Sequence, residues 1–134
     1  MSIGIDLDGT ISKVRLYNPS FQLPLWLFIL LVPLIVFIRP DKEAVKKIKK
    51  MKGEGYRIIV VSARPPWATN LTMRWLSLHC VPFDKIFCVG FGKGTKYRKL
   101  EVIKKENIRY FFDDNKKIVE FLKQNFIGAT TNFL

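Results

Sequence analysis

The sequence contains few of the residues that build disulfide frameworks and zinc sites. Its 134 residues include two cysteines and one histidine. Cys80 and Cys88 occur in no Cys-x-x-Cys or Cys/His ligand spacing, so neither a disulfide scaffold nor a structural zinc site is predicted. The sequence has no internal repeat and no low-complexity segment. It also lacks a basic start followed by a short apolar stretch and a cleavage site, so we do not expect export.

Acidic residues are also scarce. Eleven Asp and Glu residues stand against 23 Lys and Arg residues, which gives a formal net charge of +12. This excess favours anionic partners, which include nucleic acid, an anionic membrane surface and phosphorylated small molecules. Because 49% of the residues are apolar, we expect one folded domain over residues 1–134 rather than a disordered basic tail.

Short apolar runs alternate with helical patterns along the chain. The predicted strands are 2–5, 57–62, 85–89 and 109–112, and the predicted helices are 42–52, 65–79, 96–106 and 116–126. The run at 57–62 is rich in β-branched residues, which is typical of a strand buried on both faces of a parallel sheet. The order predicts an α/β fold, a Rossmann-like three-layer parallel sheet with right-handed crossovers.

Acidic residues follow two of these predicted strands. Asp6 and Asp8 follow the first strand, and Asp113 and Asp114 follow the fourth. Ligands of open parallel sheets bind at the carboxyl ends of the strands, so these four carboxylates are expected to converge. Clustered carboxylates repel one another unless a cation lies between them, and a set of oxygen ligands suits Mg²⁺.

The motifs, in this order, resemble those of the haloacid dehalogenase superfamily of aspartate-dependent phosphotransferases. The first strand ends in Asp6-Leu7-Asp8-Gly9-Thr10, the second ends at Ser62, a lysine follows, and an acidic pair comes after the fourth strand. The resemblance implies that Asp6 is the nucleophile that forms an aspartyl-phosphate. It implies that Asp8 protonates the leaving oxygen and then activates water.

The same resemblance implies a set of phosphate and metal ligands. The substrate phosphate is expected to contact Ser62, Ala63, Arg64 and Lys99. Lys93 and Lys96 remain alternatives to Lys99 as the family's lysine, and a structural role remains an alternative for Arg64. The expected Mg²⁺ ligands are Asp6, the backbone carbonyl of Asp8, and Asp114, with Asp113 as an inner or outer partner.

An apolar segment lies where members of this superfamily carry a cap, within an insertion expected at 15–40. Residues 21–38 contain no charge and would span about 27 Å as a helix, close to the thickness of a bilayer core. A single crossing would place Asp6 and Lys99 on opposite sides, and Pro24 and Pro33 disfavour an unbroken helix. With the lysine-rich helix that follows, the segment predicts peripheral binding to the cytoplasmic face of an anionic membrane.

These observations predict a Mg²⁺-dependent phosphomonoester hydrolase that acts at a membrane surface on a phosphorylated lipid or a similar substrate. The first alternative is a soluble phosphatase of a nucleotide, a sugar phosphate or a polynucleotide end. A second alternative is a membrane adaptor without catalysis. The apolar segment could instead be buried or form a homodimer, and the absence of a recognisable RNA or DNA module disfavours nucleic acid as the partner.

Overall fold

Strands and helices alternate in the computed structural model, which describes residues 1–12, 26, 30, 38–126 and 129–131. The strands are β1 (Ser2–Ile5), β2 (Arg57–Ser62), β3 (Lys85–Cys88), β4 (Ile108–Phe112) and β5 (Ala129–Thr131). The helices are α2 (Lys42–Gly53), the short 3-10 helix η1 (Pro66–Ala68), α3 (Thr69–Leu78), α4 (Thr95–Lys105) and α5 (Lys116–Asn125).

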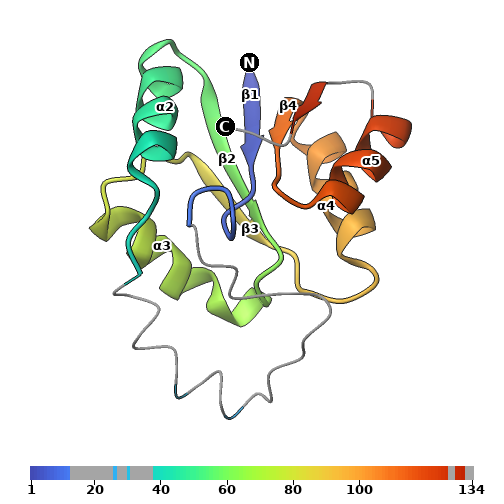
Figure 1. Ribbon diagram of the computed structural model, residues 1–134, viewed down its shortest axis with the longest axis horizontal. Helices are drawn as coiled ribbons and strands as arrows, with labels where there is room; N and C mark the ends of the chain where they lie inside the picture. The colour runs from blue at the N-terminus through green and yellow to red at the C-terminus, as the bar shows by residue number, and fades with distance from the viewer. Residues whose placement is uncertain (13–25, 27–29, 31–37, 127–128, 132–134) are drawn as a thin grey trace.

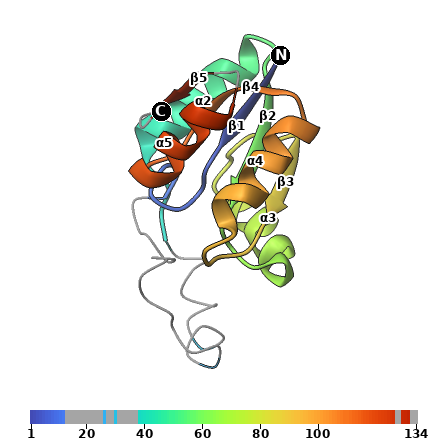
Figure 2. The ribbon, with the colours of Figure 1, turned by 90° about the vertical axis from the view of Figure 1, so that its right-hand side faces the viewer.

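The strands form one parallel sheet in the order β3-β2-β1-β4-β5. The strand β1 therefore lies at the centre, where Ile5 pairs with Val60 of β2 and with Phe112 of β4. Helices α2 and α3 cover one face of the sheet and α4 and α5 cover the other, as Figures 1 and 2 show. The prediction of a three-layer parallel α/β fold is confirmed.

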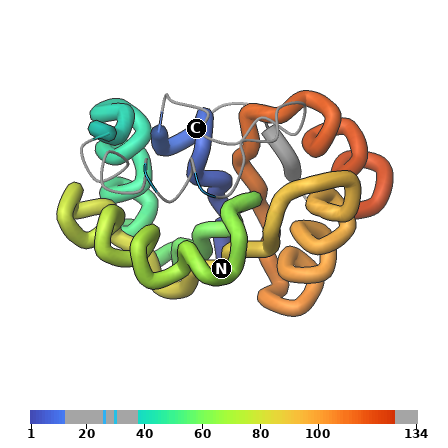
Figure 3. The backbone as a smooth tube through the Cα atoms, turned by 90° about the horizontal axis from the view of Figure 1, so that it is seen from below, coloured from blue at the N-terminus to red at the C-terminus, as the bar shows by residue number. Residues whose placement is uncertain are grey.

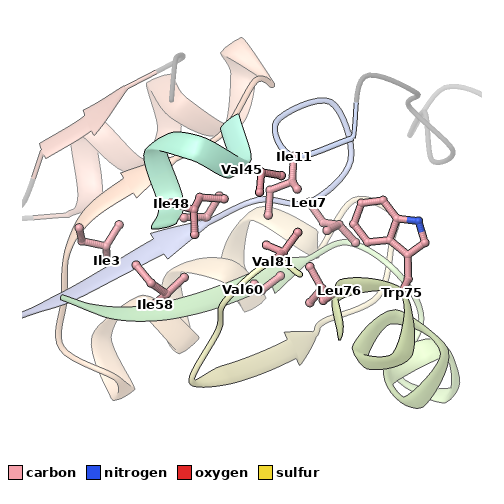
Figure 4. Packing of buried hydrophobic residues seen from close by; sticks show 11 residues of the cluster. Ile3, Leu7, Ile11, Val45, Ile48, Ile58, Val60, Trp75, Leu76 and Val81 are labelled. Carbon is pink, nitrogen blue, oxygen red and sulfur yellow. The ribbon is translucent and has the colours of Figure 1, made fainter. Parts of the chain in front are cut away.

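Two apolar cores lie on either side of the sheet, and β2 contributes to both. Ile58 and Val60 pack into the core beneath α2 and α3, while Ile59 and Val61 pack into the core beneath α4 and α5. Figure 4 shows the first core, in which Val60 lies among side chains from β1, α2 and α3. Since side chains alternate along a strand, a continuous apolar run is what a strand buried on both faces requires.

The charge pattern of α2 follows the helix dipole. The carboxylate of Asp41 accepts a hydrogen bond from the backbone N–H of Glu43 at 3.0 Å and caps the helix. Glu43 lies in the first turn, and Lys50 and Lys52 lie in the last. Acidic groups near the N-terminus and basic groups near the C-terminus both stabilise a helix.

One strand of the sheet was not predicted. The sequence analysis ended at the helix 116–126, but Ala129–Thr131 forms β5 and pairs with Tyr110–Phe112 of β4. A three-residue strand carries little periodicity of its own, and its pairing depends on the strand beside it. The predicted helix at 65–79 is also divided, because η1 precedes α3.

The apolar segment 21–38 lies almost entirely outside the described residues, so its interpretation as a membrane-binding cap stays a prediction. Where the segment ends, the backbone oxygen of Ile38 accepts a hydrogen bond from the indole N–H of Trp75 on α3 at 2.8 Å. Within the portions that the structure describes, none of the helices has the length and hydropathy needed to cross a bilayer.

Candidate active site

Asp6 and Asp113 lie side by side because they follow neighbouring strands. The backbone N–H of Asp6 donates to the oxygen of Phe112 at 2.8 Å, which continues the pairing of β1 with β4 beyond Ile5. Asp113 is the next residue after Phe112. Both carboxylates are buried, with 5% and 1% of the residue exposed. The topology thus places two buried acids at the carboxyl edge of the sheet.

Lys99 of α4 connects these two carboxylates. Its ammonium lies 2.7 Å from Oδ1 of Asp6 and 2.6 Å from Oδ2 of Asp113, and the residue is 1% exposed. Burial by itself lowers the pKa of Lys99, but the attraction of the two carboxylates outweighs this effect and raises the pKa above its ordinary value. Lys99 is therefore a permanent cation at the bottom of the site.

The acids outnumber this cation. Burial raises the pKa of Asp6 well above its ordinary value, and the attraction of Lys99 offsets only part of the rise, to which repulsion from Asp113 and Asp8 adds. Carboxylate oxygens of Asp6, Asp113 and Asp114 lie within 4.8 Å of one another. Three carboxylates around a single lysine form an oxygen donor set with excess negative charge, and such a set fits Mg²⁺.

Asp8 has a different partner, Arg64. Nε and Nη2 of Arg64 donate to the two carboxylate oxygens of Asp8 at 3.0 and 2.8 Å, and Nη1 donates to the hydroxyl of Thr72 at 3.2 Å. Arg64 is 2% exposed and Asp8 is 8% exposed. A bidentate contact of this kind fixes the orientation of the carboxylate and pairs it with a positive charge.

A cavity of about 850 Å³ opens above these groups, and Asp6, Asp8, Asp113 and Asp114 form its floor. Ala63, Lys93 and Lys96 also line it. Ser62 is fully buried, and its Oγ accepts a hydrogen bond from the backbone N–H of Arg64 at 3.1 Å. Of the predicted site residues, the four aspartates, Ala63 and Lys99 line the cavity. Ser62 and Arg64 are buried and are not among its lining residues.

The chain is similar to known proteins in sequence and in fold. No family model matches the chain. A curated protein of Bacillus subtilis (strain 168), "Putative nucleotidase YqfW", is 27% identical to it over 141 aligned residues, which cover 86% of this chain and 70% of that protein. The D,D-heptose 1.7-bisphosphate phosphatase of B. bronchiseptica, solved with magnesium and phosphate, superposes with a TM-score of 0.59. That superposition covers 96% of this chain and 76% of the other, at 11% identity.

These matches support a phosphatase and agree with the resemblance of the motifs to the haloacid dehalogenase superfamily. The fold of the chain is also similar to chains in two structures of Pnkp1/Rnl/Hen1 complexes, one of them described as an RNA repair complex. Their TM-scores are 0.72 and 0.76 at 18% identity. The superpositions cover 97% of this phosphatase but 41% and 44% of those chains, so it spans less than half of their length.

The ion pair between Arg64 and Asp8 of this phosphatase was not predicted from the sequence. Arg64 was expected to contact the substrate phosphate, with a structural role as the alternative, and its guanidinium is bonded to protein groups through three nitrogens. The strand register contains a signal for this pair. Ile5 lies opposite Val60, so the residues that follow the two strands emerge next to each other.

Substitution of Arg64 distinguishes a role in orienting Asp8 from a role in binding substrate. Arg64→Lys keeps the positive charge but loses the bidentate contact with Asp8. If Arg64 orients Asp8, kcat of the phosphatase should fall at least about tenfold while KM changes little. A residue that binds substrate would raise KM instead. Steady-state kinetics of Arg64→Lys decide between them, and Arg57→Lys, an exposed arginine at the start of β2, is the control. A large rise in KM at constant kcat contradicts the orienting role.

Proposed function

We propose that this phosphatase hydrolyses phosphomonoesters of the nucleotide class with Asp6 as nucleophile, Asp8 as acid and base, and Mg²⁺ as cofactor. The observation that carries the proposal is the position of Asp6, which lines the cavity 2.7 Å from Lys99 and within 4.8 Å of carboxylate oxygens of Asp113 and Asp114. A nucleophile in that position reaches a phosphate that enters the cavity, and Lys99, together with Mg²⁺ held by the carboxylates, would balance the charge of that phosphate.

The chain's own residues account for two displacements. In the first, a carboxylate oxygen of Asp6 forms a bond to phosphorus while the bond from phosphorus to the ester oxygen breaks, and Asp8, which enters this step protonated, gives its proton to the departing oxygen. In the second, Asp8 takes a proton from water, the water oxygen bonds to phosphorus, and the bond to Asp6 breaks. Inorganic phosphate leaves, Asp6 is again a carboxylate, and Asp8 is again protonated.

Three further groups support these displacements. Arg64 keeps the carboxylate of Asp8 in one direction through both proton transfers. Lys99 places a fixed positive charge 2.7 Å from the nucleophile, where negative charge of the phosphoryl group gathers. Asp6, Asp113 and Asp114 would hold Mg²⁺, which when bound neutralises charge on the phosphoryl oxygens.

Two observations favour a nucleotide over other phosphomonoesters. The B. subtilis relative carries the name of a nucleotidase, and a cavity of about 850 Å³ has the size of sites that take ligands of that kind. The Pnkp1 neighbours come from an RNA repair complex, which makes a polynucleotide end the second candidate. A phosphorylated lipid has no support among the described residues and enters the test as a separate arm.

The test is phosphate release from nucleoside monophosphates, sugar phosphates and phosphatidic acid in liposomes, with Mg²⁺ and after chelation. We expect release from nucleotides that stops with the chelator, returns with added Mg²⁺ and is absent in Asp6→Asn. Release from phosphatidic acid alone would replace the nucleotide class by a lipid. No release from any ester, or equal release by Asp6→Asn, would overturn the proposed function.

Gly9 provides a separate test of the metal site. It has a φ of +90°, and a Cβ at this position would collide with the carboxylate of Asp114. Gly9→Ala is expected to displace Asp114 and to raise the Mg²⁺ concentration for half-maximal activity at least about tenfold. Gly55→Ala is the matched control, because Gly55 has a φ of +88° but a Cβ there would meet no heavy atom of the described residues within 4 Å, its chain neighbours aside. An equal Mg²⁺ requirement in the two variants would exclude Asp114 from the metal site.

A further inference from the structure

Besides Lys99, four lysines line the active-site cavity. We call Lys93, Lys96, Lys116 and Lys117 the lysine rim; all four line the cavity. The acidic residues that line the same cavity are the four aspartates of the floor. Lys93, Lys116 and Lys117 are exposed, and no ion pair is recorded for them in the part of the chain that the structure describes. The floor is therefore acidic, and the rim is basic.

Three of the rim lysines oppose the dipoles of the two helices that carry them. Lys96 lies at the start of α4, Lys116 and Lys117 open α5, and neither helix has an acidic residue in its first turn. The helix α2 shows the stabilising order, with Glu43 in its first turn. Positive charge at a helix N-terminus is unfavourable, and an anion bound there would remove the conflict. Two helices with the same conflict at one cavity indicate an anionic ligand.

Aromatic rings accompany these lysines. Phe91 is 42% exposed and Tyr97 is 59% exposed, and both line the cavity. Arg98 holds the loop that carries Phe91, because Nε donates to the oxygen of Val89 at 2.5 Å and Nη2 donates to the oxygens of Gly90 and Phe91 at 3.1 and 3.0 Å. The rim is therefore accompanied by two exposed rings, Phe91 on a loop that Arg98 holds in place and Tyr97 in the first turn of α4.

We propose that the lysine rim binds the nucleic-acid chain behind a terminal phosphate, so that the substrate class is the phosphorylated end of a single-stranded polynucleotide. This inference rests on the proposed function and extends it. A mononucleotide has one phosphate, which the floor and Lys99 accommodate. The rim has four further cations, and in a polynucleotide these meet the next phosphates while Phe91 and Tyr97 stack on unpaired bases.

The experiment compares substrates that differ only in length. The wild-type chain with Mg²⁺ is given adenosine monophosphates and short oligoadenylates that carry the same 5′ or 3′ terminal phosphate. We expect kcat/KM to be at least about tenfold higher for the better oligoadenylate, with an advantage that shrinks as salt is added. Removing the ring of Phe91 or Tyr97 by alanine substitution should reduce this advantage at least about fivefold.

Two triple variants test whether position matters or only total charge. Alanine at Lys93, Lys116 and Lys117 should lower the ratio of the oligoadenylate kcat/KM to the mononucleotide kcat/KM at least about tenfold. Alanine at Lys42, Lys46 and Lys49, which are exposed on α2, removes the same charge away from the cavity and should leave the ratio unchanged. A wild-type ratio near one, or equal losses in the two triple variants, would overturn the inference.

Binding without turnover separates this inference from the proposed function. Fluorescence anisotropy of a labelled, phosphorylated oligoadenylate with Asp6→Asn measures binding without hydrolysis, and the rim triple variant in the same background shows the share of the rim. If no ester is hydrolysed but binding weakens at least about tenfold only in the rim triple variant, the rim stands and the proposed function fails. Hydrolysis of mononucleotides without oligoadenylate binding would overturn the inference about the lysine rim and leave the proposed function intact. Anionic lipid vesicles that bind through the rim lysines, with no oligoadenylate binding, would also overturn it.

Discussion

Asp6→Asn is expected to lower kcat by at least about three orders of magnitude while the fold persists. The amide cannot attack phosphorus as a carboxylate does, and it brings no charge to a metal ion. The fold should survive because burial makes an ionised carboxylate costly at this position, as the raised pKa of Asp6 indicates. Lys99 also keeps Asp113 as a partner at 2.6 Å.

Steady-state kinetics and thermal unfolding of the same preparation check this prediction. Asp41→Asn is the matched control, since it makes the same chemical change at the N-cap of α2, where asparagine serves about as well as aspartate. We expect Asp41→Asn to keep both kcat and the unfolding temperature. If Asp6→Asn retained more than about a tenth of the activity, Asp6 would not be the nucleophile.

Lys99→Met is expected to cause a large loss of stability together with a loss of activity. Methionine fills much of the same volume but leaves Asp6 and Asp113 buried without their shared cation. Breaking a buried ion pair from one side costs about 3–5 kcal/mol. Removing the positive charge from a developing phosphoryl anion lowers kcat about a hundredfold or more.

Urea unfolding and kinetics of Lys99→Met against Lys104→Met measure both effects. Lys104 lies on the same helix but is exposed, so its substitution should cost less than about 1 kcal/mol. The pKa of Lys99 is raised above its ordinary value of 10.5, so its contribution is fully present below that pH and is lost as pH rises through the higher value. The difference between the variants should therefore not fall as pH rises from 6 to 9, and a difference that disappears over that rise would contradict the ion pair.

The burial of Lys99, as compared with its alternatives Lys93 and Lys96, shows how much of the site follows from helical spacing. Thr95, Lys99 and Ile103 are spaced by four residues and are the buried residues of α4. The helical period places Lys99 on this buried face, whereas Lys96 is half-buried. The catalytic role of Lys99 stays a prediction, but its burial could have been predicted from the pattern.

Other features were less accessible from the sequence. The positions of Asp6 and Asp113 follow from the general rule that parallel strands end at one edge, and the structure brings these residues together. The partners of Arg64 depend on the direction of a long side chain, which the packing of Thr72 and the turn after β1 decides. The strand β5 depends on β4 in the same way. Local patterns predicted most of the helices and strands. The contacts between their side chains depend on packing, which these patterns do not contain.

The central place of β1 in the sheet has a consequence for folding. Its partners are Arg57–Val60 on one side and the segment that begins at Ile108 on the other, so β1 cannot pair with a neighbour until much later parts of the chain have been synthesised. Contacts between such distant segments slow folding towards milliseconds or longer, and they keep the strand exposed in the meantime. Recovery of activity after dilution from denaturant should thus coincide with the slowest step of refolding, because Asp6 and Asp113 meet only when β1 and β4 join.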